Sequence, residues 1–154
     1  MIPIAISLHV LSSIIWVGGM FFAYMVLRPI AAHQFEPAER LTLWNNVFST
    51  FFPWVWCAAL ILLTTGLWLI FNKFGGMKFV GPHIHIMLSI GLIMILIFTY
   101  VFFAPTRRLS RAVSQSNWPE GAKNLNRIRL LIATNLILGL IVIVVASIGP
   151  YFFN

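Results

Sequence analysis

Residues 79–106 read FVGPHIHIMLSIGLIMILIFTYVFFAPT and contain no Asp, Glu, Lys or Arg. Such a segment supplies the ~20 apolar residues that an α-helix needs to cross a bilayer. Three more stretches are free of these charges: residues 1–27, 41–72 and 130–154. Because lipid offers the backbone no hydrogen bonds and the stretches lack strand-like alternation, helices are expected. The sequence predicts four transmembrane spans, at about residues 3–27, 47–71, 82–104 and 129–150.

The composition of the chain supports the same interpretation. Of its 154 residues, 60% are hydrophobic and 8% are charged, whereas soluble proteins are about a quarter charged. A chain this short cannot hide so much apolar surface in one core. The single cysteine excludes an intramolecular disulfide framework and a CxxC motif. We therefore predict an all-α protein, a polytopic bundle of four transmembrane helices that forms one domain over residues 1–154.

The charges of the loops predict the orientation in the membrane. The loops after the first and third spans carry these cations: Arg28, Arg40, Arg107, Arg108, Arg111, Lys123, Arg127 and Arg129. The loop after the second span carries only Lys73 and Lys78. By the positive-inside rule, the two strongly basic loops face the cytoplasm and both termini are periplasmic. We expect a multi-pass protein of the bacterial inner (cytoplasmic) membrane, whose net charge of +7 reflects topology rather than binding to nucleic acid.

Small and polar residues follow helical spacing within the spans, which is typical of faces that pack against neighbouring helices. The first span carries His9, Ser12, Ser13, Trp16, Gly19 and Ala23, and the fourth carries Asn135, Gly139, Val142, Ala146 and Gly149. In the third span, His85 and Ser89 share a face that we expect to point into the bundle. Residues 28–41 are expected to be a loop made of a turn followed by a short helix start. The loop after the third span is expected to contain a short basic amphipathic segment at 107–113 suited to anionic lipid, and a turn at 118–121.

Three histidines fall at similar depth near the predicted periplasmic face: His9, His83 and His85. His83 and His85 are two residues apart, about 200° around an α-helix, so both cannot face one point. We therefore expect His9 and His85 to form the pair, with His83 toward another face of the helix or the mouth of the bundle. Met87 follows His83 by four residues, and imidazole with thioether suits copper, especially Cu(I). The predicted metal ligands are His9, His83, His85 and Met87, although a histidine in a span also serves as a hydrogen-bonded packing residue.

Haem b is the alternative cofactor. His9 and His85 from two helices could be its axial ligands, and glycines in every span could leave room for the macrocycle: Gly18, Gly19, Gly66, Gly91 and Gly139. The three carboxylates lie outside the spans, and no Ser-His-Asp set, phosphate loop or HExxH is present, which disfavours hydrolytic chemistry. The sequence leaves open whether the chain is an enzyme, forms a homo-oligomer, or exchanges metal or electrons with a periplasmic donor.

Several short motifs resemble the copper-resistance protein D (CopD-like) family, in its short four-helix members. They are Leu8-His9-Val10, Ile15-Trp16-Val17-Gly18-Gly19-Met20-Phe21-Phe22, Phe52-Pro53-Trp54-Val55-Trp56, Pro82-His83-Ile84-His85-Ile86-Met87, Trp118-Pro119-Glu120-Gly121, Asn126-Arg127-Ile128-Arg129 and Asn135-Leu136-Ile137-Leu138-Gly139. The resemblance covers nearly the whole chain and implies an inner-membrane protein linked to copper uptake or tolerance.

A more distant similarity connects the chain with the membrane haem-binding protoporphyrinogen oxidases. These are also four-helix proteins with a histidine in the first helix. Their third helix carries a His-x-Lys near its start, where this chain reads His83-Ile84-His85, and Tyr100 stands where they tend to have a nearby histidine. This similarity implies haem binding as the alternative to copper.

Overall fold

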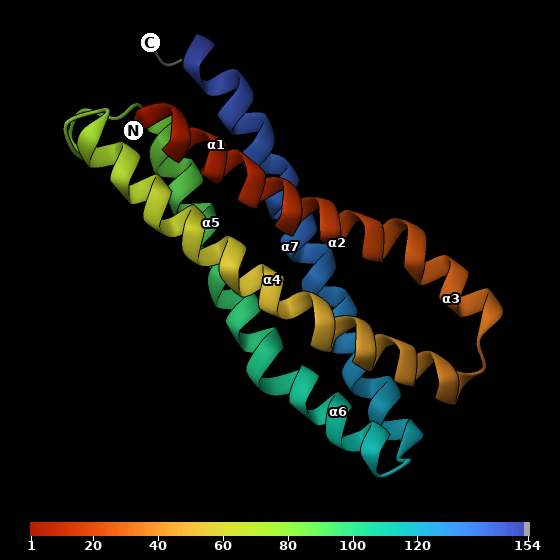
Figure 1. The fold of residues 1–154 in the computed structure, drawn as a ribbon. Coiled ribbons are helices and arrows are strands. Elements are labelled where there is room, and N and C mark those ends of the chain that lie inside the picture. Colours follow the sequence, from red (N-terminus) through yellow and green to blue (C-terminus); the bar gives the residue numbers. More distant parts are fainter. Residues whose placement is uncertain (153–154) are drawn as a thin grey trace.

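The computed structural model describes residues 1–152, which form four long helical rods without a β-strand in that range (Figure 1). The first rod contains α1 (Ile2–Ser13), η1 (Ile14–Gly18), α2 (Gly19–Phe21), η2 (Phe22–Leu27) and α3 (Arg28–Gln34), where η marks a π-helical turn. The second rod is α4 (Pro37–Asn72). The third contains α5 (Pro82–Val101), η3 (Phe102–Thr106) and α6 (Arg107–Ser114), and the fourth is α7 (Trp118–Phe152).

Each rod is long and apolar enough to cross a membrane, which confirms the predicted all-α fold with four transmembrane helices. The rods are longer than the predicted spans. Even a rod of 33 residues is about 50 Å long at about 1.5 Å per residue, whereas the hydrocarbon core of a bilayer is about 30 Å thick. The loop expected at residues 28–41 and the loop expected after the third span are therefore shorter than predicted, and the turn expected at 118–121 is wrong, because these residues begin α7. Residues 28–34 and 107–114 are helical, and the basic segment 107–113 continues the third rod.

Two prolines explain why the sequence suggested loops at those places. Proline lacks an N–H and its ring clashes with the carbonyl group four residues earlier, so it normally ends or kinks an α-helix. The turn η2 directly precedes α3, which carries Pro29 in its first turn, and η3 contains Pro105. The wider π-helical turns accommodate the prolines without ending the rods.

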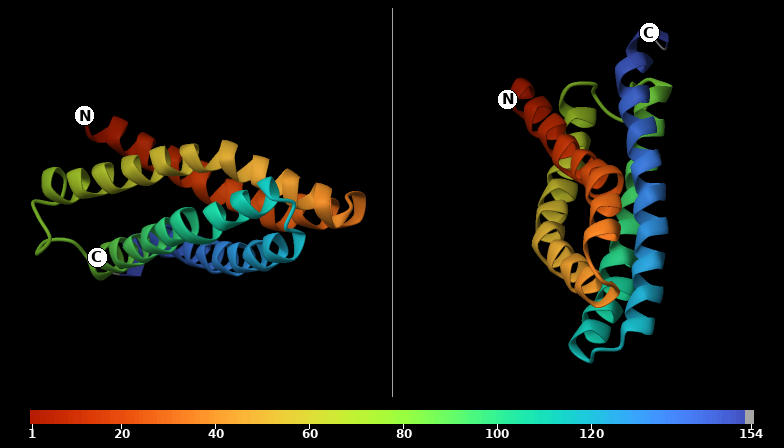
Figure 2. Two further views of the ribbon diagram at one scale, coloured as in Figure 1. Left: turned by 90° about the horizontal axis from the view of Figure 1, so that it is seen from below. Right: turned by 90° about the vertical axis from the view of Figure 1, so that its right-hand side faces the viewer.

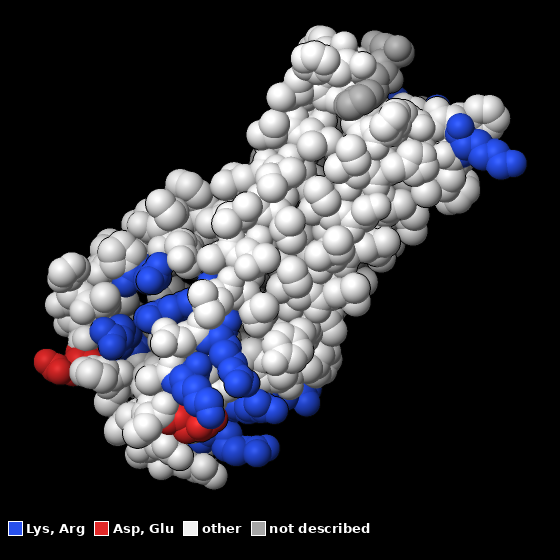
Figure 3. All heavy atoms as spheres, turned by 180° about the vertical axis from the view of Figure 1, so that it is seen from behind, with Lys and Arg blue, Asp and Glu red and all other residues white. Residues whose placement is uncertain are grey.

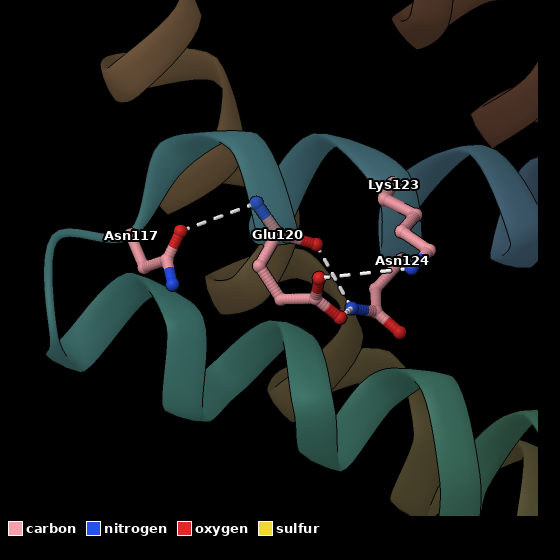
Figure 4. A network of polar contacts seen from close by, with 4 residues as sticks. All are labelled: Asn117, Glu120, Lys123 and Asn124. Atoms are coloured by element: carbon pink, nitrogen blue, oxygen red, sulfur yellow. Dashed lines mark hydrogen bonds and ion pairs between the residues drawn. The ribbon is translucent and has the colours of Figure 1, made fainter.

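Local capping sets where α4 and α7 begin, at the turns that connect α3 to α4 and α6 to α7. The side chain of Glu36 caps α4, and Glu39 reaches back to the backbone N–H of Glu36, a reciprocal capping box. At the start of α7, Asn117 accepts a hydrogen bond from the N–H of Glu120 at 3.3 Å (Figure 4). The buried side chain of Asn124 donates to Glu120 Oε1 at 2.8 Å. The connection between α3 and α4 consists of residues 35–36, and that between α6 and α7 consists of residues 115–117.

The rods pack as two pairs, α1 along α4 and α5 along α7. The pairs approach each other near the α3–α4 and α6–α7 turns and diverge toward the opposite end (Figure 2). We call the first end the basic end, because most Lys and Arg side chains gather there (Figure 3). We call the other end, with the N-terminus and the loop 73–81 between α4 and α5, the open end.

An aromatic core holds the two pairs together. Phe98 of α5 meets Trp16 of η1 edge-on at a centroid distance of 6.0 Å, and Phe52 of α4 at 5.3 Å. Phe52 stacks on Phe48 at 5.0 Å, and all four rings are buried. Such pairs add about 0.5–1.5 kcal/mol each beyond the burial of apolar area, so the two contacts of Phe98 help to hold the pairs together.

The small-residue faces predicted for the first and fourth spans are confirmed as packing faces. Ser12 and Trp16 are buried on the first rod, and Asn135 and Gly139 are buried on α7. Asn135 donates its side-chain N–H to the carbonyl oxygen of Met94 on α5 at 3.1 Å. Interhelical hydrogen bonds of this kind contribute about 0.6 kcal/mol in a membrane, and this one fixes how α5 is rotated against α7.

Candidate metal site

His9 is seated between α1 and α4 at the open end. Its Nδ1 lies 2.9 Å from the hydroxyl oxygen of Thr65. The Thr65 hydroxyl group also contacts the carbonyl oxygen of Ile61 within α4. When it donates its proton to that carbonyl oxygen, it accepts from His9, and in this tautomer the imidazole carries its proton on Nδ1 and offers Nε2 as a ligand atom. Metal-binding histidines are typically oriented in this way, with the second ring nitrogen donating to an oxygen.

The absence of a side chain at Gly66 leaves room for the His9 ring to pack against α4. A Cβ atom at this position would lie 3.2 Å from His9 Cε1 and 3.7 Å from His9 Nδ1, so any larger residue would press on the ring. Gly66 is one of the glycines that the sequence suggested as gaps for a haem macrocycle. In the structure, the space beside it is occupied by the imidazole.

His83 and Met87 lie half-buried near the start of α5, on the face turned toward α7. A Cβ atom at Gly149 of α7 would overlap the Cβ of His83 and lie 2.7 Å from its Cγ. His83 therefore packs closely against the backbone of α7. The four-residue spacing places Met87 one turn further along the same face.

The expectation that His85 and Ser89 point into the bundle is wrong. Both are exposed, and their face continues along α5 through the exposed Leu92 and Leu96. The opposite face is fixed by Met94, whose carbonyl group bonds Asn135, and by Phe98 in the aromatic core. These contacts with other helices outweigh the local polar pattern and turn His83, rather than His85, toward α7.

The structure thus brings the predicted ligands to one end of the molecule but places them on different helix pairs. His9 lies between α1 and α4, whereas His83 and Met87 face α7. Within residues 1–152, no group of three or more His, Cys, Asp or Glu residues is close enough to hold a metal ion. Cys57 is exposed on α4, and His33 is exposed in α3 at the basic end.

The sequence interpretation missed Thr65 and Gly66, the two residues that orient His9. Both follow Thr64 within a strongly apolar run, and a hydroxyl next to glycine in such a run is a signal for a close polar contact between helices. The haem alternative gains no support, because His85, the second axial ligand proposed for it, lies on the exposed face of α5.

The fold and the placement of its histidines define a four-helix, multi-pass membrane protein with imidazole and thioether side chains gathered at one end. The family model described as copper resistance protein D matches residues 45–148, more than half of the chain. The protein therefore belongs to the copper resistance protein D (CopD) family. No curated protein and no solved structure matches the chain. The matched range includes Thr65, His83 and Met87, whereas His9 precedes it.

Proposed function

We propose that this CopD-family protein handles copper, in uptake or tolerance, through residues at its open end. The observation that carries the proposal is the hydrogen bond between His9 Nδ1 and Thr65, which orients the imidazole so that Nε2 can serve as the ligand atom in the Nδ1-protonated tautomer. Membership of the copper-resistance family supports copper as the metal. The cluster of cations at the other end supports an orientation in the bacterial inner membrane that turns the open end toward the periplasm.

In this proposal, His9 supplies one ligand from the α1–α4 pair, and His83 with Met87 supplies imidazole and thioether from the α5–α7 pair. Thioether and neutral imidazole together favour Cu(I) over harder ions such as Mg²⁺. Copper held by both pairs would link them at the end where they diverge. His85, on the exposed face, is suited to meeting the incoming ion or a periplasmic metal donor before the internal ligands do.

Anaerobic titration of the purified protein with Cu(I), in competition with a chromophoric chelator, tests this assignment. We expect His9→Ala, His83→Ala and Met87→Leu each to weaken Cu(I) binding by about tenfold or more, since even residues that only orient ligands change metal affinity by about 10–100-fold. His33→Ala, which removes an exposed imidazole at the basic end, is the matched control and should bind as the wild type does. Wild-type affinity in both His9→Ala and His83→Ala would refute the proposal.

A further inference from the structure

Three arginines from three rods converge at the basic end. Arg28 begins α3, Arg40 lies in the first turns of α4, and Arg129 lies in α7. All three are half-buried, and Arg28 and Arg129 line the same small cavity. Like charges held together away from water are unfavourable unless an opposite charge neutralises them.

The protein's own carboxylates do not supply that charge. Glu36 and Glu39 are engaged in the capping box of α4. Glu120 accepts a hydrogen bond from Asn124 and lies 4.0 Å from Lys123, both on α7 (Figure 4). Across the described part of the chain, this contact with Lys123 is the one ion pair between side chains, and no arginine takes part in it.

Unused hydrogen-bond donors accompany the arginines. Nε of Arg129 and Nε1 of Trp44 are buried, and neither has a hydrogen-bond partner within residues 1–152. The same two residues lie around a small cavity together with Tyr24 and Arg28, and these residues present apolar surface to it. The guanidinium of Arg28 lies over the Tyr24 ring at 4.8 Å, a cation–π contact that holds it beside the cavity. Buried N–H groups left without acceptors are destabilising, so this arrangement calls for an anionic acceptor.

We propose that Arg28 and Arg129 form a binding site for a phosphate group, and that the phosphate belongs to the headgroup of an anionic phospholipid. Guanidinium groups match phosphate oxygens in charge and geometry. Arg28 directly follows the predicted span 3–27 and Arg129 begins the predicted span 129–150, which places the cluster at headgroup depth. Basic pockets between transmembrane helices recognise anionic headgroups in this way.

Thermal unfolding in an uncharged detergent tests the site. Phosphatidylglycerol should raise the unfolding temperature of the wild type, and phosphatidylcholine should not. The double variant R28Q/R129Q should need about tenfold more phosphatidylglycerol for the same shift, because it loses two charge-assisted contacts. R107Q/R108Q removes the same charge from exposed positions at the same end and should respond as the wild type does.

A second readout separates binding from a structural role. Without lipid, R28Q/R129Q should unfold at a higher temperature than the wild type, since repulsion within the cluster is relieved. If R28Q/R129Q does not fold, Trp44→Phe is the substitute variant. It removes one hydrogen-bond donor and should reduce the rise in unfolding temperature that phosphatidylglycerol produces. A shift produced by inorganic phosphate but not by the lipid would overturn the lipid as the source. Equal responses of R28Q/R129Q and R107Q/R108Q would overturn the site itself.

Discussion

Replacement of Thr65 by valine removes the hydroxyl group that orients His9 while keeping the shape of the side chain. In the wild type, His9 Nδ1 lies 2.9 Å from Thr65 Oγ1. The Thr65→Val variant lacks this hydroxyl partner, so the ring is less firmly oriented against α4 and more easily moves its proton to Nε2. A proton on Nε2 would remove the lone pair that we assign to copper.

Two magnitudes follow from this geometry. Loss of the acceptor should lower the free energy of unfolding by about 1 kcal/mol, because His9 is only half-buried and part of its solvation is recovered. Loss of ring orientation should weaken Cu(I) binding by about 10–100-fold, the range found when oxygen partners of metal-binding histidines are removed. The effect on binding should therefore exceed what the small change in stability would produce.

Chelator competition for Cu(I) and thermal unfolding, both on purified protein, measure the two effects. Thr64→Val is the matched control: Thr64 is exposed and bonds only carbonyl groups of its own helix, so its loss should leave copper affinity unchanged. Thr65→Ser keeps the hydroxyl group and should bind copper within about twofold of the wild type. The reasoning is refuted if Thr65→Val binds Cu(I) as tightly as the wild type, or if Thr64→Val weakens binding equally.

Two further predictions concern packing and orientation. Gly139→Ala places a Cβ atom 2.8 Å from Val17 and should lower the free energy of unfolding by about 1–3 kcal/mol through overpacking. In Gly91→Ala the new Cβ meets nothing within 4 Å, so this variant should gain up to about 1 kcal/mol in free energy of unfolding from helix propensity. Equal unfolding midpoints for the two variants would contradict the helix contacts described. In a Cys57→Ser background, a membrane-impermeant thiol reagent applied to intact cells should label Phe79→Cys at the open end but not Ser116→Cys at the basic end. The reverse labelling would show that the orientation is inverted.

The four membrane helices follow from the sequence because the absence of charge over a membrane-length segment is a property of the segment itself. The depth of the histidines follows as well, since it depends only on their position along each helix. The small-residue face of α7 is similarly local, and Gly139 and Gly149 are buried in the structure as that pattern predicts. These features need no knowledge of which helix lies next to which.

The rotation of α5 could not be read from its own sequence. His85 with Ser89 and His83 with Met87 are equally regular faces, and periodicity alone favours neither. The choice depends on Asn135 of α7 bonding the carbonyl group of Met94 and on Phe98 entering the aromatic core. The extents of α3 and α6 were missed for a related reason, because Pro29 and Pro105 predict helix ends unless π-helical turns accommodate them.

The arrangement of the core bears on how a copper site at the open end would work. The aromatic contacts of Phe98 with Trp16 and Phe52 join the two helix pairs about halfway along the rods, while each pair carries its own histidine at the open end. His9 lies outside the residues matched by the family model, yet Thr65 and Gly66, which seat it, lie inside them. The first helix therefore contacts the segment matched by the family model at His9, one of the proposed copper ligands. A ligand bound by both His9 and His83 would oppose further separation of the pairs, so copper should stabilise the protein against unfolding more strongly when both imidazoles are present than when either is removed.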